Sequence, residues 1–323
     1  METRSMSDPI LSVKNLKKYF TTDLGVVRAV DDISFNIATG ETFGLVGESG
    51  SGKSTTAFTV MGVYAPTAGK ILFNGREVSL TRVTKRSKDI KKEMQMVFQD
   101  PGSSLNPRQT IKQILELPLK VHNVAKGKRI EKMIELLERV ELPESYLERY
   151  PPEIGGGEKQ MVAICRAMAT DPSLIALDEP TSALDVSMQG KIINTLIKLQ
   201  KEFNYSYLFI THDLSLMRNV ATRVGIMYLG KLNEVAPATE FFHKPYHPYT
   251  KMLLSSIPVI SEEEEKMKPE KVVSRGEIPS PVNVPSGCVF HTRCNECWDL
   301  CKEREPVMVE VEPEHFVRCH LFE

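Results

Sequence analysis

The stretch "GESGSGKST", Gly47–Thr55, constrains the fold of this chain more than any other feature. It matches the pattern G-x-x-x-x-G-K-[ST] and lies between the apolar segment "FGLV" and the segment "STTAFTVMGVY", which we expect to be a strand and a helix. Glycines let such a loop curl so that its amides point at phosphate oxygens, and the helix start adds a partial positive charge. A structural glycine-rich turn is the alternative, but the flanking strand and helix favour a nucleotide site.

Lys53 is expected to neutralise the β- and γ-phosphates of ATP, and the Ser54 hydroxyl to contact Mg²⁺. The loop residues that we expect at the nucleotide are Gly47, Ser49, Gly50, Ser51, Gly52, Lys53, Ser54 and Thr55.

Two further apolar runs, "LIALDEP" and "YLFITHD", end in polar side chains. This pattern is typical of central parallel strands with functional groups at their carboxyl ends. Asp178 can support the magnesium shell, and Glu179 can orient and deprotonate a water that attacks the γ-phosphate. His212 can contact the γ-phosphate. The alternatives are an acidic pair that caps a helix and a structural histidine.

The composition is that of an ordinary globular protein, with 323 residues, 41% hydrophobic residues and a formal net charge of −1. A charge so close to zero argues against a general nucleic-acid binder, and we expect no nucleic-acid partner. No apolar run approaches the roughly 20 residues that span a bilayer, and the first residues carry no secretory signal. We therefore expect a soluble protein whose membrane contact comes through a partner.

The periodicity of the chain changes along its length. The segments "ILSVKNLKKYF" and "AVDDISFNIATGETFGLVG" are β-rich, whereas apolar residues recur at helical spacing between Thr110 and about Leu142. We interpret the latter as a mostly helical subdomain, about residues 100–171, inserted into an α/β core. The charged run "SEEEEKMKPEK" is expected to be a surface helix or linker before a small cysteine-rich tail.

Several motifs follow the phosphate loop in order: "VFQD", "GGGEKQ", "LIALDEP", "SALD" and "FITHD". This order resembles the nucleotide-binding subunit of an ABC transporter. The resemblance implies a RecA-like P-loop core with an antiparallel β subdomain. It also makes Gln99 a residue that touches Mg²⁺ and couples to the membrane subunits, and His212 the switch histidine. Tyr19 matches the aromatic that stacks on adenine, with Phe20 or a merely structural role as alternatives. The D-loop is Ser182, Ala183, Leu184 and Asp185.

Three other segments narrow the resemblance: "QDPGSSLNPRQTI", "HKPYHPYTKMLLSSIP" and the tail from "PSGC" to "RCHL". Together they resemble the ATPase subunits of dipeptide and oligopeptide ABC importers, over nearly the whole chain. The resemblance implies residues 1–255 as the nucleotide-binding domain and residues 256–323 as a C-terminal extension. It also implies a peripheral position on the cytoplasmic face of the membrane.

The implied partners are two transmembrane permease subunits, a second ATPase subunit and an extracytoplasmic substrate-binding protein. Nickel and oligosaccharides are alternative cargoes, and a soluble ABC ATPase of DNA repair, chromosome architecture or translation is the alternative of another class.

The segment "EIGGGEKQ" departs from the family's usual Leu-Ser-Gly-Gly-Gln signature. By the resemblance, Gly155, Gly156, Gly157 and Glu158 face the nucleotide bound by the other ATPase subunit. Gly155 replaces the serine, so a hydrogen bond to phosphate that contributes about 1.5–3 kcal/mol is lost. We therefore expect an asymmetric heterodimer. The site built on Lys53 and Glu179 hydrolyses ATP, whereas the site completed by the glycines is slow.

The cysteines are concentrated in the tail. By the resemblance, Cys288, Cys294, Cys301 and Cys319 match four positions that can bind a [4Fe–4S] cluster, and Cys297 is additional. Four thiolates also suit tetrahedral zinc, so zinc, a ligand role for Cys297 and free thiols stay open.

Overall fold

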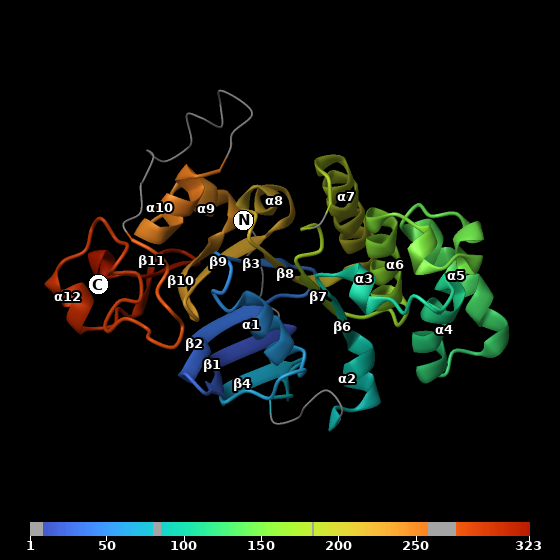
Figure 1. The fold of residues 1–323 in the computed structure, drawn as a ribbon, viewed down its shortest axis with the longest axis horizontal. Coiled ribbons are helices and arrows are strands. Elements are labelled where there is room, and N and C mark those ends of the chain that lie inside the picture. The colour runs from blue at the N-terminus through green and yellow to red at the C-terminus, as the bar shows by residue number, and fades with distance from the viewer. Residues whose placement is uncertain (1–8, 80–84, 183, 258–275) are drawn as a thin grey trace, which may run out of the picture.

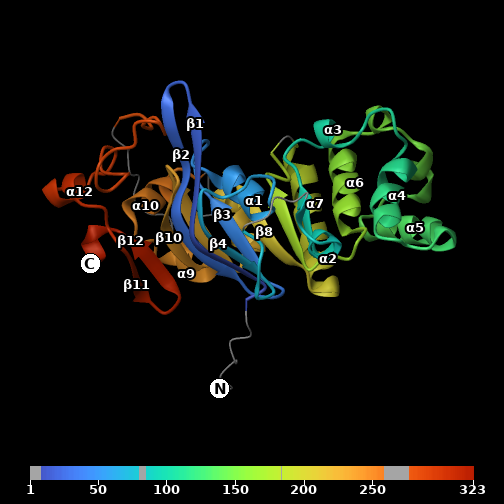
Figure 2. The same cartoon turned by 90° about the horizontal axis from the view of Figure 1, so that it is seen from below.

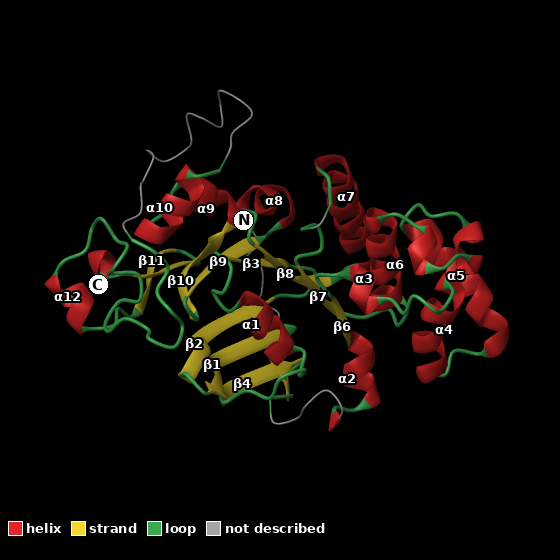
Figure 3. Ribbon diagram, viewed as in Figure 1, coloured by secondary structure: helices red, strands yellow, loops and turns green. Residues whose placement is uncertain are grey.

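The computed structural model describes residues 9–79, 85–182, 184–257 and 276–323. Their strands form two sheets (Figures 1 and 3). The larger sheet has the order β11-β12-β10-β9-β3-β8-β7-β6, and β6, β7, β8, β3 and β9 run parallel. Its strands are β3 Thr42–Val46, β6 Met94–Val97, β7 Leu174–Asp178, β8 Ser206–Thr211, β9 Arg223–Tyr228, β10 Lys231–Pro237, β11 Met308–Glu312 and β12 His315–Arg318.

The second sheet is antiparallel, with the order β2-β1-β4-β5. Its strands are β1 Leu11–Thr22, β2 Gly25–Ile37, β4 Ala68–Phe73 and β5 Arg76–Glu77. Asn74 and Gly75 join β4 to β5 with positive φ angles of 47° and 71°. Asn-Gly accepts this left-handed turn at little cost, as the sequence predicts for a tight hairpin.

Helices surround the sheets, and two helical regions mark opposite ends of the molecule (Figures 1 and 2). The helices α3 to α6 make one end of the molecule, and the C-terminal residues that contain α12 make the other. The described helices are α1 Lys53–Val60, α2 Lys88–Glu93, α3 Pro101–Ser104, α4 Ile111–Val121, α5 Arg129–Arg139, α6 Gly156–Met168, α7 Val186–Phe203, α8 Leu214–Val220, α9 Ala238–His243, α10 Pro248–Ser255 and α12 Asp299–Glu303. The helical spacing from Thr110 onward thus corresponds to α4 and α5.

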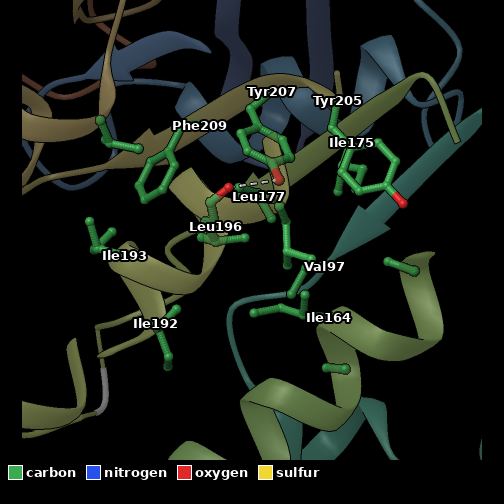
Figure 4. Packing of buried hydrophobic residues seen from close by; sticks show 14 of the residues in the cluster. Val97, Ile164, Ile175, Leu177, Ile192, Ile193, Leu196, Tyr205, Tyr207 and Phe209 are labelled. Atoms are coloured by element: carbon green, nitrogen blue, oxygen red, sulfur yellow. Dashed lines mark hydrogen bonds between the residues drawn. The ribbon is translucent and has the colours of Figure 1, made fainter. Parts of the chain in front are cut away.

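Burial of apolar side chains between the parallel strands and helices α6 and α7 fixes the position of the strand ends (Figure 4). Tyr207 is fully buried here, and its hydroxyl donates to the Leu196 carbonyl at 3.1 Å. A buried hydroxyl without such a partner would cost about 1–3 kcal/mol. The side chains drawn around it include Val97, Ile164, Ile175, Leu177, Ile192, Ile193, Leu196, Tyr205 and Phe209.

The C-terminal hairpin of β11 and β12 continues the larger sheet, because β12 pairs with β10. Glu234 of β10 and His315 of β12 are both buried, and His315 Nε2 lies 2.7 Å from Glu234 Oε1. The tail is therefore attached to the core by backbone pairing and by side chains. The charged run "SEEEEKMKPEK" lies outside the described residues.

Among the described helices, none is both long and apolar enough to cross a membrane.

Candidate active site

The phosphate loop joins β3 to α1, and close approaches explain two of its glycines. Gly52 has a φ of +105°, and a Cβ there would lie 2.0 Å from the Ala29 carbonyl oxygen. A Cβ on Gly47 would lie 2.1 Å from the Met227 carbonyl oxygen. Both contacts are with backbone that cannot move aside, so the loop conformation requires glycine at these positions.

Lys53 is buried and lies inside the loop. Its Nζ donates to the carbonyl oxygens of Gly47 at 2.8 Å and of Glu48 at 2.9 Å. Burial lowers the pKa of this ammonium, while the carboxylates of Glu179, Asp178 and Glu48 act in the opposite direction. The loop carbonyls thus hold the Lys53 ammonium inside the loop.

Asp178 ends β7 beside the first turn of α1. It accepts a hydrogen bond from the Ser54 hydroxyl at 2.8 Å. Burial raises the pKa of Asp178, and the Ser54 hydrogen bond opposes that shift. A hydroxyl and a buried carboxylate side by side are oxygen ligands of the kind that Mg²⁺ prefers.

Glu179 follows Asp178 and contacts two other predicted site residues. Its Oε2 accepts from the Gln99 amide at 3.1 Å and lies 3.2 Å from His212 Nδ1. Glu179 has a φ of +45°, an uncommon conformation for a residue with a side chain, and its N–H donates to the Ile210 carbonyl. The strand end therefore turns sharply, and this turn brings the carboxylate between the two neighbouring elements.

Tyr19 lies on β1, outside this network. Its hydroxyl hydrogen bonds to Asp31, and burial together with that bond raises the pKa of Tyr19 to about 12. Phe20, the alternative, packs edge-on against Tyr64 with ring centroids 5.3 Å apart. Both rings are partly buried.

The glycine triplet opens α6, as the sequence predicts, but the three glycines differ. Gly155 is the N-cap with extended backbone angles, φ −69° and ψ 167°, and its N–H donates to Glu158 Oε2 at 2.7 Å. A Cβ on Gly157 would lie 2.3 Å from Met188 Cγ on α7, whereas one on Gly155 would meet nothing closer than 3.5 Å. Packing therefore explains Gly157, and the backbone does not require glycine at position 155.

The D-loop residues lie between Glu179 and α7. The Ser182 hydroxyl donates to the Glu179 carbonyl at 3.2 Å, and the Asp185 carboxylate caps α7 by accepting from the Met188 N–H at 3.0 Å. Leu184 reaches the start of α6, where a Cβ on Gly156 would lie 3.3 Å from it. Ala183 lies outside the described residues.

The four predicted cysteine ligands line one small cavity, and none of them forms a disulfide. They are Cys288, Cys294, Cys301 and Cys319. The cavity measures about 10 Å³, roughly the space of a single water molecule. Burial raises the pKa of Cys288 and of Cys294 to about 12, which favours neutral thiols.

Across the described residues, no group of three or more His, Cys, Asp or Glu side chains is arranged to hold a metal ion. Four thiols beside one cavity would suit a metal by their chemistry, but the described side chains do not form an arrangement that could hold one. The structure therefore gives the sequence-based expectation of an iron–sulfur site no support. Cys297 is not among the cavity residues.

One pair of residues beside the phosphate loop has no counterpart in the sequence predictions. Arg293, from the C-terminal segment, donates to both carboxylate oxygens of Glu48, at 2.7 and 3.1 Å. Glu48 occupies an unspecified position of the loop pattern, and the two residues are 245 positions apart. No motif or periodicity in the sequence relates them.

The fold and the phosphate site together define an ATPase of the ATP-binding cassette class. The ABC transporter family model matches residues 30–182, and the model described as oligopeptide/dipeptide transporter, C-terminal region, matches residues 233–301. The chain belongs to the family of oligopeptide transport ATP-binding proteins of ABC transporters.

Relatives from Bacillus subtilis (strain 168) match over nearly their whole length. The oligopeptide transport ATP-binding protein AppF is 48% identical over 99% of both chains, and OppF is 44% identical over 97% of both.

Two solved structures share the fold. A dimeric post-hydrolysis state of the ATP-binding cassette MJ0796 bound to ADP and Pi has a TM-score of 0.63 and 28% identity, over 71% of this chain and 98% of that one. The cbiO1 subunit of the cbiONQ transporter from Clostridium perfringens has a TM-score of 0.66 and 26% identity, over 74% and 92%.

Proposed function

We propose that this chain is the subunit that hydrolyses ATP to power peptide import through an ABC transporter. One observation carries the catalytic part of the proposal: Glu179 meets Gln99 and His212 at a strand end beside the phosphate loop. The relatives named for oligopeptide transport, similar over almost the whole chain, support the cargo.

In this proposal, Lys53 and the loop amides bind the β- and γ-phosphates. Ser54, Asp178 and Gln99 would hold Mg²⁺, which would stabilise the negative charge on the phosphate oxygens. Glu179 orients a water and accepts its proton as that water attacks the γ-phosphate. His212 holds Glu179 on one side and is free to contact the γ-phosphate, since its side chain is 57% exposed. Tyr19 stacks on adenine.

We further propose residues 1–255 as the nucleotide-binding domain and residues 256–323 as an extension. The group α3–α6, within about residues 100–171, would receive the permease subunits. Leu117, Val121 and Ile130 support this, because they are large apolar side chains exposed on that group. The assembly comprises two permeases, a second ATPase and an extracytoplasmic binding protein, with this chain on the cytoplasmic face.

Reconstitution tests the proposal directly. Vesicles with the permeases, both ATPases and a peptide-loaded binding protein are expected to take up peptide only when MgATP is present on the side of this subunit. Nickel or oligosaccharide uptake in place of peptide would contradict the cargo. Absence of ATP-dependent uptake of any of them would contradict the transport function.

The second part of the proposal concerns asymmetry between the two ATP sites. In a sandwich dimer, each site would combine one subunit's phosphate loop with the other's signature. The start of α6 has no hydrogen bond to its own phosphate loop among those of the described residues, which leaves it available to a second subunit. The dimeric state recorded for MJ0796 supports such a pairing. The site completed by Gly155 lacks the serine hydroxyl and would turn over slowly.

The variant Gly155→Ser is expected to speed the slow site about tenfold, the lower end expected for one hydrogen bond to a charged group. The N-cap backbone is extended and a Cβ there has ordinary contacts, so serine fits without strain. A single-turnover chase of radiolabelled ATP in the assembled transporter would resolve a fast and a slow phase, and the slow phase reports this site.

The matched control is Gly190→Ser on α7, where an added Cβ meets nothing within 4 Å. It should leave both phases unchanged. A slow phase that Gly155→Ser does not accelerate would contradict the role of the missing hydroxyl, and a homodimer would contradict the asymmetry.

The four-cysteine site remains a prediction of the sequence. No step of the proposed mechanism depends on it. Iron content and visible absorption of the anaerobically purified protein, with zinc measured in parallel, would decide whether the thiols hold a metal.

A further inference from the structure

We infer that Arg293 of the C-terminal segment is a positioning residue for the phosphate loop, acting through the carboxylate of Glu48. The inference rests on the proposed function, because it concerns how tightly the loop binds MgATP. It assigns to the C-terminal segment a direct part in the ATP site.

The contact is specific in geometry. The two guanidinium nitrogens of Arg293 donate to the two carboxylate oxygens of Glu48 at 2.7 and 3.1 Å, a bidentate pair. Tyr249 adds a second anchor, since its hydroxyl lies 3.2 Å from both the Glu48 carboxylate and the Glu48 N–H. Glu48 is thus held by its backbone and its side chain, directly after Gly47 of the loop.

The pair lies in surroundings that make its loss costly. The side chain of Arg293 is 6% exposed, and its guanidinium lies over the rings of Tyr228 and Phe290 at 5.6 and 5.9 Å. The Glu48 side chain is 26% exposed, so the pair is partly buried. When one partner of such a pair is removed, part of the cost comes from the charge that stays behind without a partner. Loss of Arg293 would leave the Glu48 carboxylate uncompensated beside the phosphates.

The charge of Glu48 acts on the phosphate site itself. The Glu48 carbonyl accepts a hydrogen bond from Lys53 Nζ at 2.9 Å. The Glu48 carboxylate acts to raise the pKa of Lys53, against the larger lowering by burial. A carboxylate released from Arg293 would compete with the phosphates for that cation and would repel them. Arg293 therefore stabilises the conformation of the loop. It also neutralises a carboxylate that would otherwise repel an anion.

A second connection joins the C-terminal segment to the strand behind the loop. Lys231 lies 3.0 Å from Asp31 of β2 and 2.7 Å from Glu305, which in turn pairs with Arg318 at 3.0 Å. Asp31 is also the partner of the Tyr19 hydroxyl. The segment thus contacts the nucleotide site from two directions, and Arg293 reaches the phosphate loop itself.

The test is a double-mutant cycle in the assembled transporter, with KM for MgATP and kcat measured separately. Arg293→Met is expected to raise KM about tenfold and to change kcat less than about twofold, as expected when a charge pair is broken outside the reacting atoms. Adding Glu48→Gln to Arg293→Met removes the uncompensated charge and is expected to bring KM back to within about threefold of wild type. A merely structural role of Arg293 predicts no such rescue.

The control is Arg304→Met, in the same segment, where the arginine pairs with Glu323 rather than with the loop. Its KM should equal that of wild type. If Arg293→Met does not assemble, Arg293→Lys is used, and it should raise KM about threefold because one donor replaces a bidentate pair. Unchanged KM in the Arg293 variants, or a raised KM that Glu48→Gln does not relieve, would overturn the inference. Wild type that does not bind MgATP would instead contradict the proposed function.

Discussion

Replacement of Glu179 by glutamine is expected to slow ATP hydrolysis about a thousandfold while MgATP binding stays within about threefold of wild type. The carboxylate is the group that we propose to take the proton of the attacking water. Glutamine has the same shape and keeps an oxygen for the contacts with the Gln99 amide and with His212, at 3.1 and 3.2 Å in the wild type. It cannot accept a proton at neutral pH, so the defect should appear in kcat rather than in binding. The measurement is phosphate release by the assembled transporter, with nucleotide retention measured in parallel.

The control for this variant is Glu141→Gln, which removes a surface carboxylate paired with Lys191 at 3.7 Å. Surface pairs of this kind contribute at most about 1 kcal/mol, so turnover should not change. If wild type and Glu179→Gln hydrolyse ATP at the same rate in the full complex, then Glu179 is not the base. If both hydrolyse ATP equally slowly, a protein that binds nucleotide without hydrolysing it would be the better interpretation.

The sequence predicts the glycine-rich loop and the strands beside it because each pattern is short and local. The loop pattern specifies where glycines are needed, and Gly52 with its φ of +105° shows why. Apolar runs that end in Asp178 and His212 predict central parallel strands, and β7 and β8 do run parallel, as neighbours in the sheet. Since parallel strands bring their carboxyl ends to one edge, side chains far apart in sequence could be expected to meet there.

Other features depend on tertiary contacts that no local pattern contains. The packing of Gly157 against Met188 depends on how α6 and α7 lie together, and the pairing of β12 with β10 depends on how the tail folds back. The ion pair of Glu48 with Arg293 joins residues at opposite ends of the chain. The family resemblance implies that four thiols converge, but not the size of the cavity that they line.

Lys53→Ala is the change from which we expect the largest loss of MgATP binding, because one side chain both neutralises phosphate and shapes the loop. Its ammonium donates to the carbonyls of Gly47 and Glu48, and these contacts would pass to phosphate oxygens when ATP binds. Loss of charge-assisted hydrogen bonds at this position is expected to weaken MgATP binding about a hundredfold. Uptake in reconstituted vesicles should stop.

Thermal unfolding with and without MgATP separates lost binding from lost folding. At a ligand concentration of 100 times Kd, binding stabilises the wild type by about 2.7 kcal/mol, and a hundredfold weaker Kd reduces this to about 0.4 kcal/mol. Without nucleotide, Lys53→Ala should unfold close to the wild-type temperature, since burial of this ammonium carries its own cost, seen in its lowered pKa. Lys302→Ala, which removes an exposed lysine paired with Asp299 at 2.9 Å, is the matched control and should behave as wild type. Uptake by Lys53→Ala at the wild-type rate would contradict a mechanism in which this loop binds the ATP that drives transport.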